Sequence, residues 1–136
     1  MLDYIIRKSD NKIYVSIDNQ YLIYDTTFQK YVNRILLKRL SNLEALEKST
    51  KKYFLIKNKV PLLLSKDILL LCVISYRMLN LTYINYFSIS KYERKNKEVC
   101  IYFYSGHCLK TENVYAFIKQ YKYARKIIDK IHELDF

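Results

Sequence analysis

Apolar and polar positions along the chain follow two different periods, and the change of period separates strands from helices. Residues 1–25 contain two strand-like segments, DYIIRK and IYVSIDNQYLIYD, each bounded by turn residues. From Phe28 onward the apolar residues recur every three or four positions, which predicts an amphipathic helix over residues 26–48. The chain is therefore expected to open with a small antiparallel meander that leads into a helix.

The single proline of the sequence indicates where the next strands begin. Because proline has no backbone N–H, it is confined within sheets to strand starts and edges. VPLLLS is thus predicted to be a strand that starts at Pro61 and turns at Lys66-Asp67 into a second strand, ILLLCVIS. Both runs are almost entirely apolar, so we expect this hairpin to be central in its sheet. Further short strands, separated by the charged turn ERKNKE and a serine-glycine turn, extend the hairpins over residues 59–112.

A second helical period occupies the C-terminal part of the chain. Asn113 is a suitable N-cap for a helix over residues 113–134. Its apolar face, which we expect to be buried, consists of Val114, Phe117, Ile118, Tyr121, Ala124, Ile128 and Ile131. Its opposite face carries Lys119, Lys122, Lys126 and Lys130. The whole pattern predicts one α+β domain over residues 1–136, with a mainly antiparallel sheet of short hairpins, a central amphipathic helix and a C-terminal helix.

Composition is that of a folded protein of the cytosol. The 136 residues, of which 51% are hydrophobic, are enough to bury one core. The longest apolar run is far shorter than a membrane span, and the N-terminus has no signal-peptide pattern, so we expect a cytoplasmic protein without membrane contact. Three cysteines, an odd number without a CxxC pair, argue against a disulfide framework and against a zinc module.

Residues suited to catalysis are few. His132 lies in the last turns of the predicted C-terminal helix, where the helix dipole favours a cation. His107 and Cys108 are adjacent on a predicted strand, so their side chains point to opposite faces and cannot form a dyad. With Gly106 as the only glycine, a phosphate-cradling loop is excluded. We therefore expect a binding protein that is not an enzyme and that uses no cofactor, metal or small-molecule substrate.

The formal charge of +11 favours a polyanionic partner, either nucleic acid or anionic lipid. An AT-rich genome offers another explanation, because it raises the content of lysine, isoleucine, asparagine and tyrosine in any protein. The distribution of charge argues for a partner: residues 26–60 contain nine Lys or Arg against two Glu, whereas residues 1–25 contain three basic and four acidic side chains. Lys30, Arg34 and Lys38 also follow one another at i, i+4 spacing, so their like charges repel one another. Either a bound anion or simple solvation can relieve this repulsion.

Several short motifs occur in a fixed order between residues 28 and 128. They are Ser41-Asn42 in the place of a serine turn, Lys59-Val60-Pro61-Leu62 in the place of Lys-x-Pro-Ile, Ser75, Tyr83-Ile84 in the place of Trp-Ile, and Phe103 with Gly106 in the place of Phe-x-x-Gly. In this order the motifs resemble the competence transcription factor family ComK. The resemblance implies a bacterial regulator of transcription that reads AT-rich DNA through the minor groove. It also implies homodimers or higher homo-oligomers on DNA, and hence association with the nucleoid.

Two departures from the family pattern concern its DNA contacts and its turnover. Ala45-Leu46 stand where the family has Gly-Arg, and Cys72-Val73 where it has Pro-Thr, so one arginine that could touch DNA is absent. The chain also ends at Phe136, without the longer tail through which an adaptor delivers family members to a protease, and we do not expect turnover by that route.

Two other interpretations remain open. The stretch SYRMLNLTYINYF is also similar to the Arg-Ser-x-x-Val-Asn-x-x-x-Ile stretch of LytTR domains, which bind DNA through loops. Those domains place a helix before this stretch, whereas Pro61 and the Lys66-Asp67 turn predict a β-hairpin, which favours ComK. A third interpretation is a small interaction or inhibitor protein of a mobile element, whose basic charge is incidental.

Candidate contacts to DNA follow from the placement of cations. A narrow A-tract groove attracts Lys and Arg with little need for base-specific donors. The residues expected in loops and turns that could enter the groove are Lys51, Lys52, Lys57, Lys59, Arg77, Arg94, Lys95 and Lys97. Along the rim, phosphates would meet the helical residues Lys30, Arg34 and Lys38.

Overall fold

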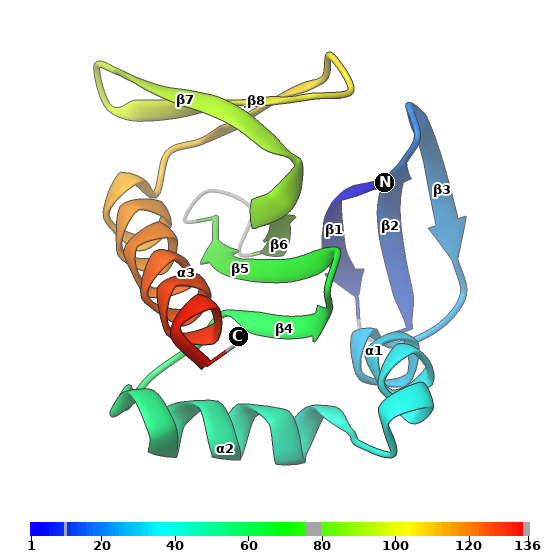
Figure 1. The fold of residues 1–136 in the computed structure, drawn as a ribbon. Helices are drawn as coiled ribbons and strands as arrows, with labels where there is room; N and C mark the ends of the chain where they lie inside the picture. The colour runs from blue at the N-terminus through cyan, green and yellow to red at the C-terminus, as the bar shows by residue number, and fades with distance from the viewer. Residues whose placement is uncertain (10, 76–79, 135–136) are drawn as a thin grey trace.

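The computed structural model describes residues 1–9, 11–75 and 80–134, and it shows an α+β domain with two antiparallel sheets (Figure 1). The strands are β1 (Leu2–Ser9), β2 (Lys12–Ile17), β3 (Gln20–Tyr24), β4 (Leu62–Ser65), β5 (Ile68–Ile74), β6 (Leu81–Asn85), β7 (Ile89–Lys95), β8 (Glu98–Phe103) and β9 (Cys108–Thr111). The six-stranded sheet has the order β3-β2-β1-β6-β5-β4, and the three-stranded sheet the order β7-β8-β9. A 3₁₀ turn, η2 (Tyr86–Ser88), joins the two sheets. The fold class and the N-terminal meander predicted from the sequence are confirmed.

Helices cover both faces of the six-stranded sheet. They are α1 (Phe28–Leu36), which continues into the 3₁₀ turn η1 (Leu37–Arg39), α2 (Leu43–Phe54) and α3 (Val114–Leu134). One face of the sheet packs against α1, while α3 and the three-stranded sheet pack against the other. In Figure 1, α2 runs alongside β4, and α1 and α3 lie on opposite sides of the molecule.

Burial of β5 on both faces explains its unbroken apolar sequence. Leu70 and Cys72 belong to the core on the α1 side, whereas Leu69, Leu71 and Val73 belong to the core on the α3 side. Alternate side chains of a strand point to opposite faces, so a strand between two cores needs apolar residues at every position. The two cores together place β5 at the centre of the packing.

The prediction of a single helix over residues 26–48 was wrong. The chain leaves the helical path at Leu40, whose φ of 54° is left-handed, and restarts as α2. Two asparagines stabilise this break: the Asn33 side chain accepts a hydrogen bond from the Leu43 N–H at 2.7 Å, and Asn42 caps α2 by accepting from the Ala45 N–H at 2.9 Å. Apolar spacing continued through Leu40 and concealed the end of α1.

The predicted β4–β5 hairpin is present, but it is not central as a whole, because β4 is an edge strand. Pro61 directly precedes β4, in agreement with the restriction of proline to strand starts and edges. The Arg39 guanidinium donates to two carbonyls of β4, those of Leu64 at 3.1 Å and Leu63 at 3.5 Å. This edge of the sheet is thus capped by a side chain and flanked by α2.

The C-terminal helix begins as predicted, after Asn113, whose side chain accepts a hydrogen bond from the Ala116 N–H at 3.2 Å. Its fully buried positions differ in part from the predicted stripe, since Gln120 and Ile127 are buried beside Phe117 and Ala124. The polar Gln120 at a core position has a specific structural role, which is described with the site.

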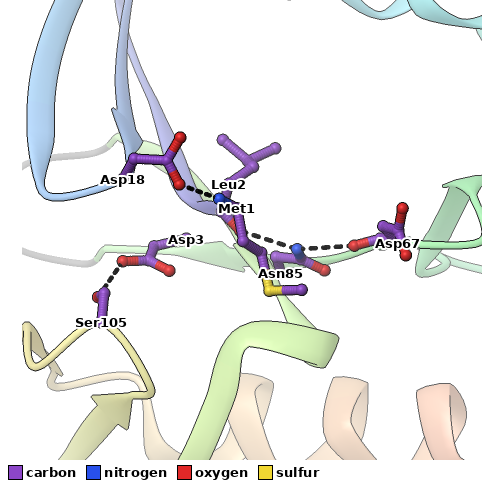
Figure 2. Close-up of polar contacts among 7 residues, drawn as sticks. All are labelled: Met1, Leu2, Asp3, Asp18, Asp67, Asn85 and Ser105. Atoms are coloured by element: carbon purple, nitrogen blue, oxygen red, sulfur yellow. Dashed lines mark hydrogen bonds and ion pairs between the residues drawn. The ribbon is translucent and has the colours of Figure 1, made fainter.

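Buried Asn85, at the end of β6, joins segments that are far apart in the sequence (Figure 2). Its amide nitrogen donates to the carbonyls of Leu2 at 2.8 Å and Asp67 at 3.0 Å. The Asn85 side-chain oxygen accepts from the Leu69 N–H at 3.1 Å. Because each polar atom of the amide is paired, the residue holds β1 and the β4–β5 turn in register with β6.

Buried Asp3 connects the two sheets. The Ser105 hydroxyl, in the turn between β8 and β9, donates to the Asp3 carboxylate at 2.6 Å (Figure 2). Beside this contact the rings of Tyr4 and Phe103 lie 5.8 Å apart. The contacts fix the tip of the three-stranded sheet against β1.

Candidate nucleic-acid interface

Four lysines from three segments surround one hollow of about 560 Å³. Lys51 lies in the last turn of α2, Lys57 and Lys59 lie in the loop between α2 and β4, and Lys119 lies in the second turn of α3. The other residues that line the hollow are Asn58, Cys72, Ile74, Asn113, Tyr115, Ala116 and Gln120. We refer to this feature as the lysine hollow.

Gln120 builds the floor of the lysine hollow. Its amide nitrogen donates to the Lys59 carbonyl at 3.0 Å, and its side-chain oxygen accepts from the Cys72 N–H at 3.0 Å. The side chain is 5% exposed, so these hydrogen bonds are shielded from water. By this bridge, α3 fixes the lysine-bearing loop against β5.

Apolar anchors and a second amide complete the frame. Ile56 and Val60 are buried, whereas Lys57, Asn58 and Lys59 between them are exposed. Asn113 donates to the Ile74 carbonyl at 2.9 Å and so ties the end of β5 to the start of α3. The backbone of the loop is therefore held at both ends, while its cationic side chains face solvent.

Carboxylates are scarce around the lysine hollow. Within the described residues, Lys51, Lys57, Lys59 and Lys119 form no ion pair. Glu47 lines a smaller adjoining hollow together with Lys51 and Lys59. Because a cation in the last turn of a helix is stabilised by the helix dipole, the charge of Lys51 is favourable there without a carboxylate partner. No such stabilisation applies to Lys57 and Lys59.

Aromatic rings flank the fourth lysine. The Lys119 ammonium lies 5.6 Å from the centroid of the Tyr115 ring and 5.8 Å from that of Tyr123. Tyr115 is 73% exposed at the rim of the hollow. An exposed ring beside cations offers a planar apolar contact to a sugar or a base in addition to charge.

The Cys72 thiol lies in the wall between the two hollows and is not set up for reaction. Burial raises the pKa of this thiol above its ordinary value of 9.0, although the nearby Lys59 ammonium opposes the effect. Tyr83, on the neighbouring strand, also has a raised pKa, first because of burial and then because of the adjacent Cys72. Both groups therefore stay neutral at physiological pH and contribute no charge to the wall.

The β7–β8 hairpin carries a second set of cations. The predicted charged turn is shorter than expected, because β7 extends to Lys95 and only Asn96-Lys97 form the turn. Arg94, Lys95 and Lys97 are exposed. Two of the cations on this hairpin are paired with Glu93, Lys95 at 3.4 Å and Lys91 at 3.5 Å, and these contacts lower the pKa of that carboxyl.

The helical set does not join the others. Lys30 and Arg34 are exposed on α1, and Lys38 is exposed in η1. In Figure 1, α1 lies on the opposite side of the molecule from α3 and the β7–β8 turn. The helical set is therefore separate from the cations of α3 and the β7–β8 turn.

Of the predicted contacts, the structure brings together Lys51, Lys57 and Lys59. Lys52 is exposed one position further along α2 and does not line the hollow, and Arg77 lies outside the described residues. Sequence reasoning missed Lys119, Tyr115 and Gln120 as parts of this site. A polar Gln120 between Phe117 and Ala124 on the apolar face of a helix was a signal for a buried bridge, but its partners could not be read from the sequence.

Comparison of the chain with protein-family models, curated proteins and solved structures finds no match. Among the helices in the described part of the chain, none is both long and apolar enough to cross a membrane.

Proposed function

We propose that this protein binds double-stranded DNA through the end of the molecule that carries the lysine hollow, and that it regulates transcription in the manner of the ComK family. The observation that carries the proposal is the convergence of four lysines from α2, the following loop and α3 around one hollow with no ion-paired carboxylate among the described residues. Such unneutralised cations are the positions at which backbone phosphates bind.

The β7–β8 hairpin supplies the element that reads the groove. Its turn consists of Asn96 and Lys97, the residues at and beside this turn are charged, and Arg94 forms no ion pair with a carboxylate of the described residues. A guanidinium is less strongly hydrated than an ammonium and so enters a narrow AT-rich minor groove at lower cost. In this arrangement the lysine hollow holds phosphates and Arg94 provides the preference for AT-rich sequence.

The hairpin formed by β4 and β5 favours the ComK interpretation over the LytTR one. It occupies the position directly before residues 75–87, and in that position LytTR domains have a helix instead. The ComK motifs Lys59-Val60-Pro61-Leu62 and Ser75 also lie at the two ends of this hairpin, next to the lysine hollow.

Salt-dependent DNA binding tests the proposal. Fluorescence anisotropy with an AT-rich duplex is measured at several salt concentrations for the unaltered protein and for two double variants. If about six phosphates are contacted, the slope of log K against log salt is near −5. Lys57→Ala with Lys59→Ala is expected to reduce the magnitude of the slope by about two.

Lys30→Ala with Arg34→Ala is the matched control, because it removes the same charge from exposed positions on α1. We expect this control to leave the slope nearly unchanged. A salt-independent titration of the unaltered protein would exclude the DNA proposal, and equal effects of both double variants would exclude the lysine hollow as the phosphate site.

Sequence preference is tested at Arg94 by competition between AT-rich and mixed duplexes. Arg94→Ala is expected to reduce the preference, and Arg94→Lys to restore only part of it, because the charge returns without the guanidinium. Unchanged preference in both variants, with the protein still folded, would place the reading element elsewhere.

A further inference from the structure

The two edges of the six-stranded sheet differ in their protection. At one edge, Arg39 donates to the carbonyls of Leu63 and Leu64 on β4, and α2 runs alongside. At the other edge, β3 pairs with β2 and with no other strand of the described residues. Natural edge strands are usually blocked by charges, proline or bulges. Residues 20–24 contain neither a charge nor a proline, and their register with β2 is continuous.

The geometry of the β2–β3 turn shows which backbone groups of β3 face outward. Asp18 and Asn19 have φ values of 48° and 66°, as in a two-residue hairpin turn of the primed kind. Ile17 and Gln20 then form the hydrogen-bonded pair that closes the turn, and the pairs alternate along the strands. It follows that the N–H and C=O groups of Tyr21 and Ile23 point away from β2.

The same two residues also expose apolar side chains. Tyr21 is 52% exposed and Ile23 is 59% exposed, and both lie on one face of the strand. The Tyr21 ring lies 5.5 Å from that of Tyr14 on β2, so the exposed apolar surface continues inward from the edge. An edge with free backbone groups and an apolar flank is a template for another strand.

We propose that β3 is the interface of a homodimer, in which two copies pair their β3 strands antiparallel about a two-fold axis at Leu22. In this register Tyr21 faces Ile23 of the second copy, and Ile23 faces Tyr21. Both members of each pair have outward backbone groups, so about four hydrogen bonds form. The two aromatic and β-branched pairs lie on one face, as favourable cross-strand pairs do.

Charge favours a second copy of this chain as the occupant. The protein carries +11, so two copies repel each other over most of their surface. Residues 1–25, which form β1 to β3, are the exception, with four acidic and three basic side chains. The least repulsive approach between two copies therefore passes through this edge. It also leaves the lysine hollow free, because α3 and β3 lie on opposite sides of the molecule in Figure 1.

The interface is small, and we expect a reversible dimer. One pair of five-residue strands buries less than roughly 1,200 Å², the lower limit of standard interfaces, which suggests a Kd on the order of micromolar. Sedimentation velocity without DNA is measured over about 1 to 500 μM, around the expected Kd. Because no DNA is present, the result does not depend on the function proposed above.

Two single variants locate the interface. Ile23→Lys places a charge at the strand edge and is expected to give a monomer at all concentrations. Leu37→Lys adds the same charge at a comparably exposed position, 66% against 59%, on η1 and is expected to dimerise like the unaltered protein. The proposal would be overturned if the unaltered protein were monomeric at the highest concentration. This is the result expected if β3 instead binds a strand of a different protein. Equal dimerisation of both variants would also overturn the proposal.

Cross-linking tests the register. With exposed Cys108 replaced by serine, Leu22→Cys brings two thiols together at the two-fold axis, where non-hydrogen-bonded partners lie about 4.5 Å apart between Cα atoms. Gln20→Cys is the control, because Gln20 faces Tyr24 of the second copy rather than itself. Mild oxidation is expected to give a disulfide-linked dimer only for Leu22→Cys. Equal cross-linking at both positions would exclude this register.

Discussion

The half of the six-stranded sheet that contains β4 and β5 and the half that contains β2 and β3 differ in their surroundings. The first is enclosed by α3 on one face and by α1 on the other, and its outer strand is capped by Arg39. On the second, β2 packs on α1 through Ile13 and Val15, while Tyr21 and Ile23 on β3 remain exposed. The difference predicts that stability is concentrated at the enclosed end of the sheet, and it leaves the edge of β3 open for the association proposed above.

The largest expected effect is the loss of the fold when a charge is placed in the enclosed half. Leu62, on β4, is 3% exposed, so Leu62→Asp buries a carboxylate without a partner. This costs about 4 kcal/mol or more, a large part of the stability of an ordinary domain. We expect the cooperative thermal melt, followed by circular dichroism, to disappear.

Ile23→Asp applies the same kind of change in the open half, where the side chain remains in water. We expect its melting temperature to stay within a few degrees of the unaltered value. A cooperative melt of Leu62→Asp close to that of Ile23→Asp would show that the two halves of the sheet do not differ as described.

A smaller effect is expected from removal of the Gln120 bridge. Gln120→Ala leaves the Cys72 N–H and the Lys59 carbonyl without their hydrogen-bond partner, which costs about 2 kcal/mol in urea unfolding. Because the loop is released, DNA affinity is also expected to fall even though every lysine is retained. Lys122→Ala, on the exposed face of the same helix, is the control for stability. Unchanged unfolding and binding in Gln120→Ala would mean that the bridge does not hold the loop.

The smallest effect concerns stability at alkaline pH. Burial raises the pKa of the Cys72 thiol and of the Tyr83 phenol above their ordinary values of 9.0 and 10.0. The unfolded chain therefore ionises first, so the stabilisation is complete below pH 9 and is lost as the pH rises through the higher pKa values of the folded state. We expect the free energy of unfolding, from urea titrations, to fall above pH 9.

Tyr83→Phe is expected to weaken the alkaline loss above pH 10, because one of the two groups no longer ionises. An identical alkaline profile in Tyr83→Phe would remove Tyr83 from this account.

Sequence pattern was sufficient for most of the strands, because local residues such as Asn19 and Pro61 mark where they begin or end. It failed at Leu40, where a leucine adopts a left-handed backbone that normally calls for glycine or asparagine; the local signal was Asn42 two residues later, which caps α2. It also placed the whole β4–β5 hairpin at the centre of the sheet. An apolar strand sequence indicates only that the strand is buried, and helices can bury an edge strand as completely as neighbouring strands bury a central one.

The site was predictable only in part, for a related reason. Lys57 and Lys59 could be selected because they stand in a basic loop of the sequence. Lys119 could not be added, because it comes from a helix 60 residues later and is brought to the loop by the Gln120 bridge. Which cations share a surface depends on such long-range contacts, and these are fixed by tertiary packing.

The pairing of β1 with β6 has a consequence for folding during synthesis. Tyr4 lies opposite Ile84, so β1 must wait for about 80 further residues before its second neighbour exists. At roughly 5 to 20 residues per second on the ribosome, this interval lasts about 4 to 16 s. Throughout it the β1–β3 meander has two open edges, and closure of so long a loop carries a large entropic cost. We therefore expect the nascent N-terminal meander to expose unpaired strand edges, and so to be prone to aggregation, until β6 has been synthesised.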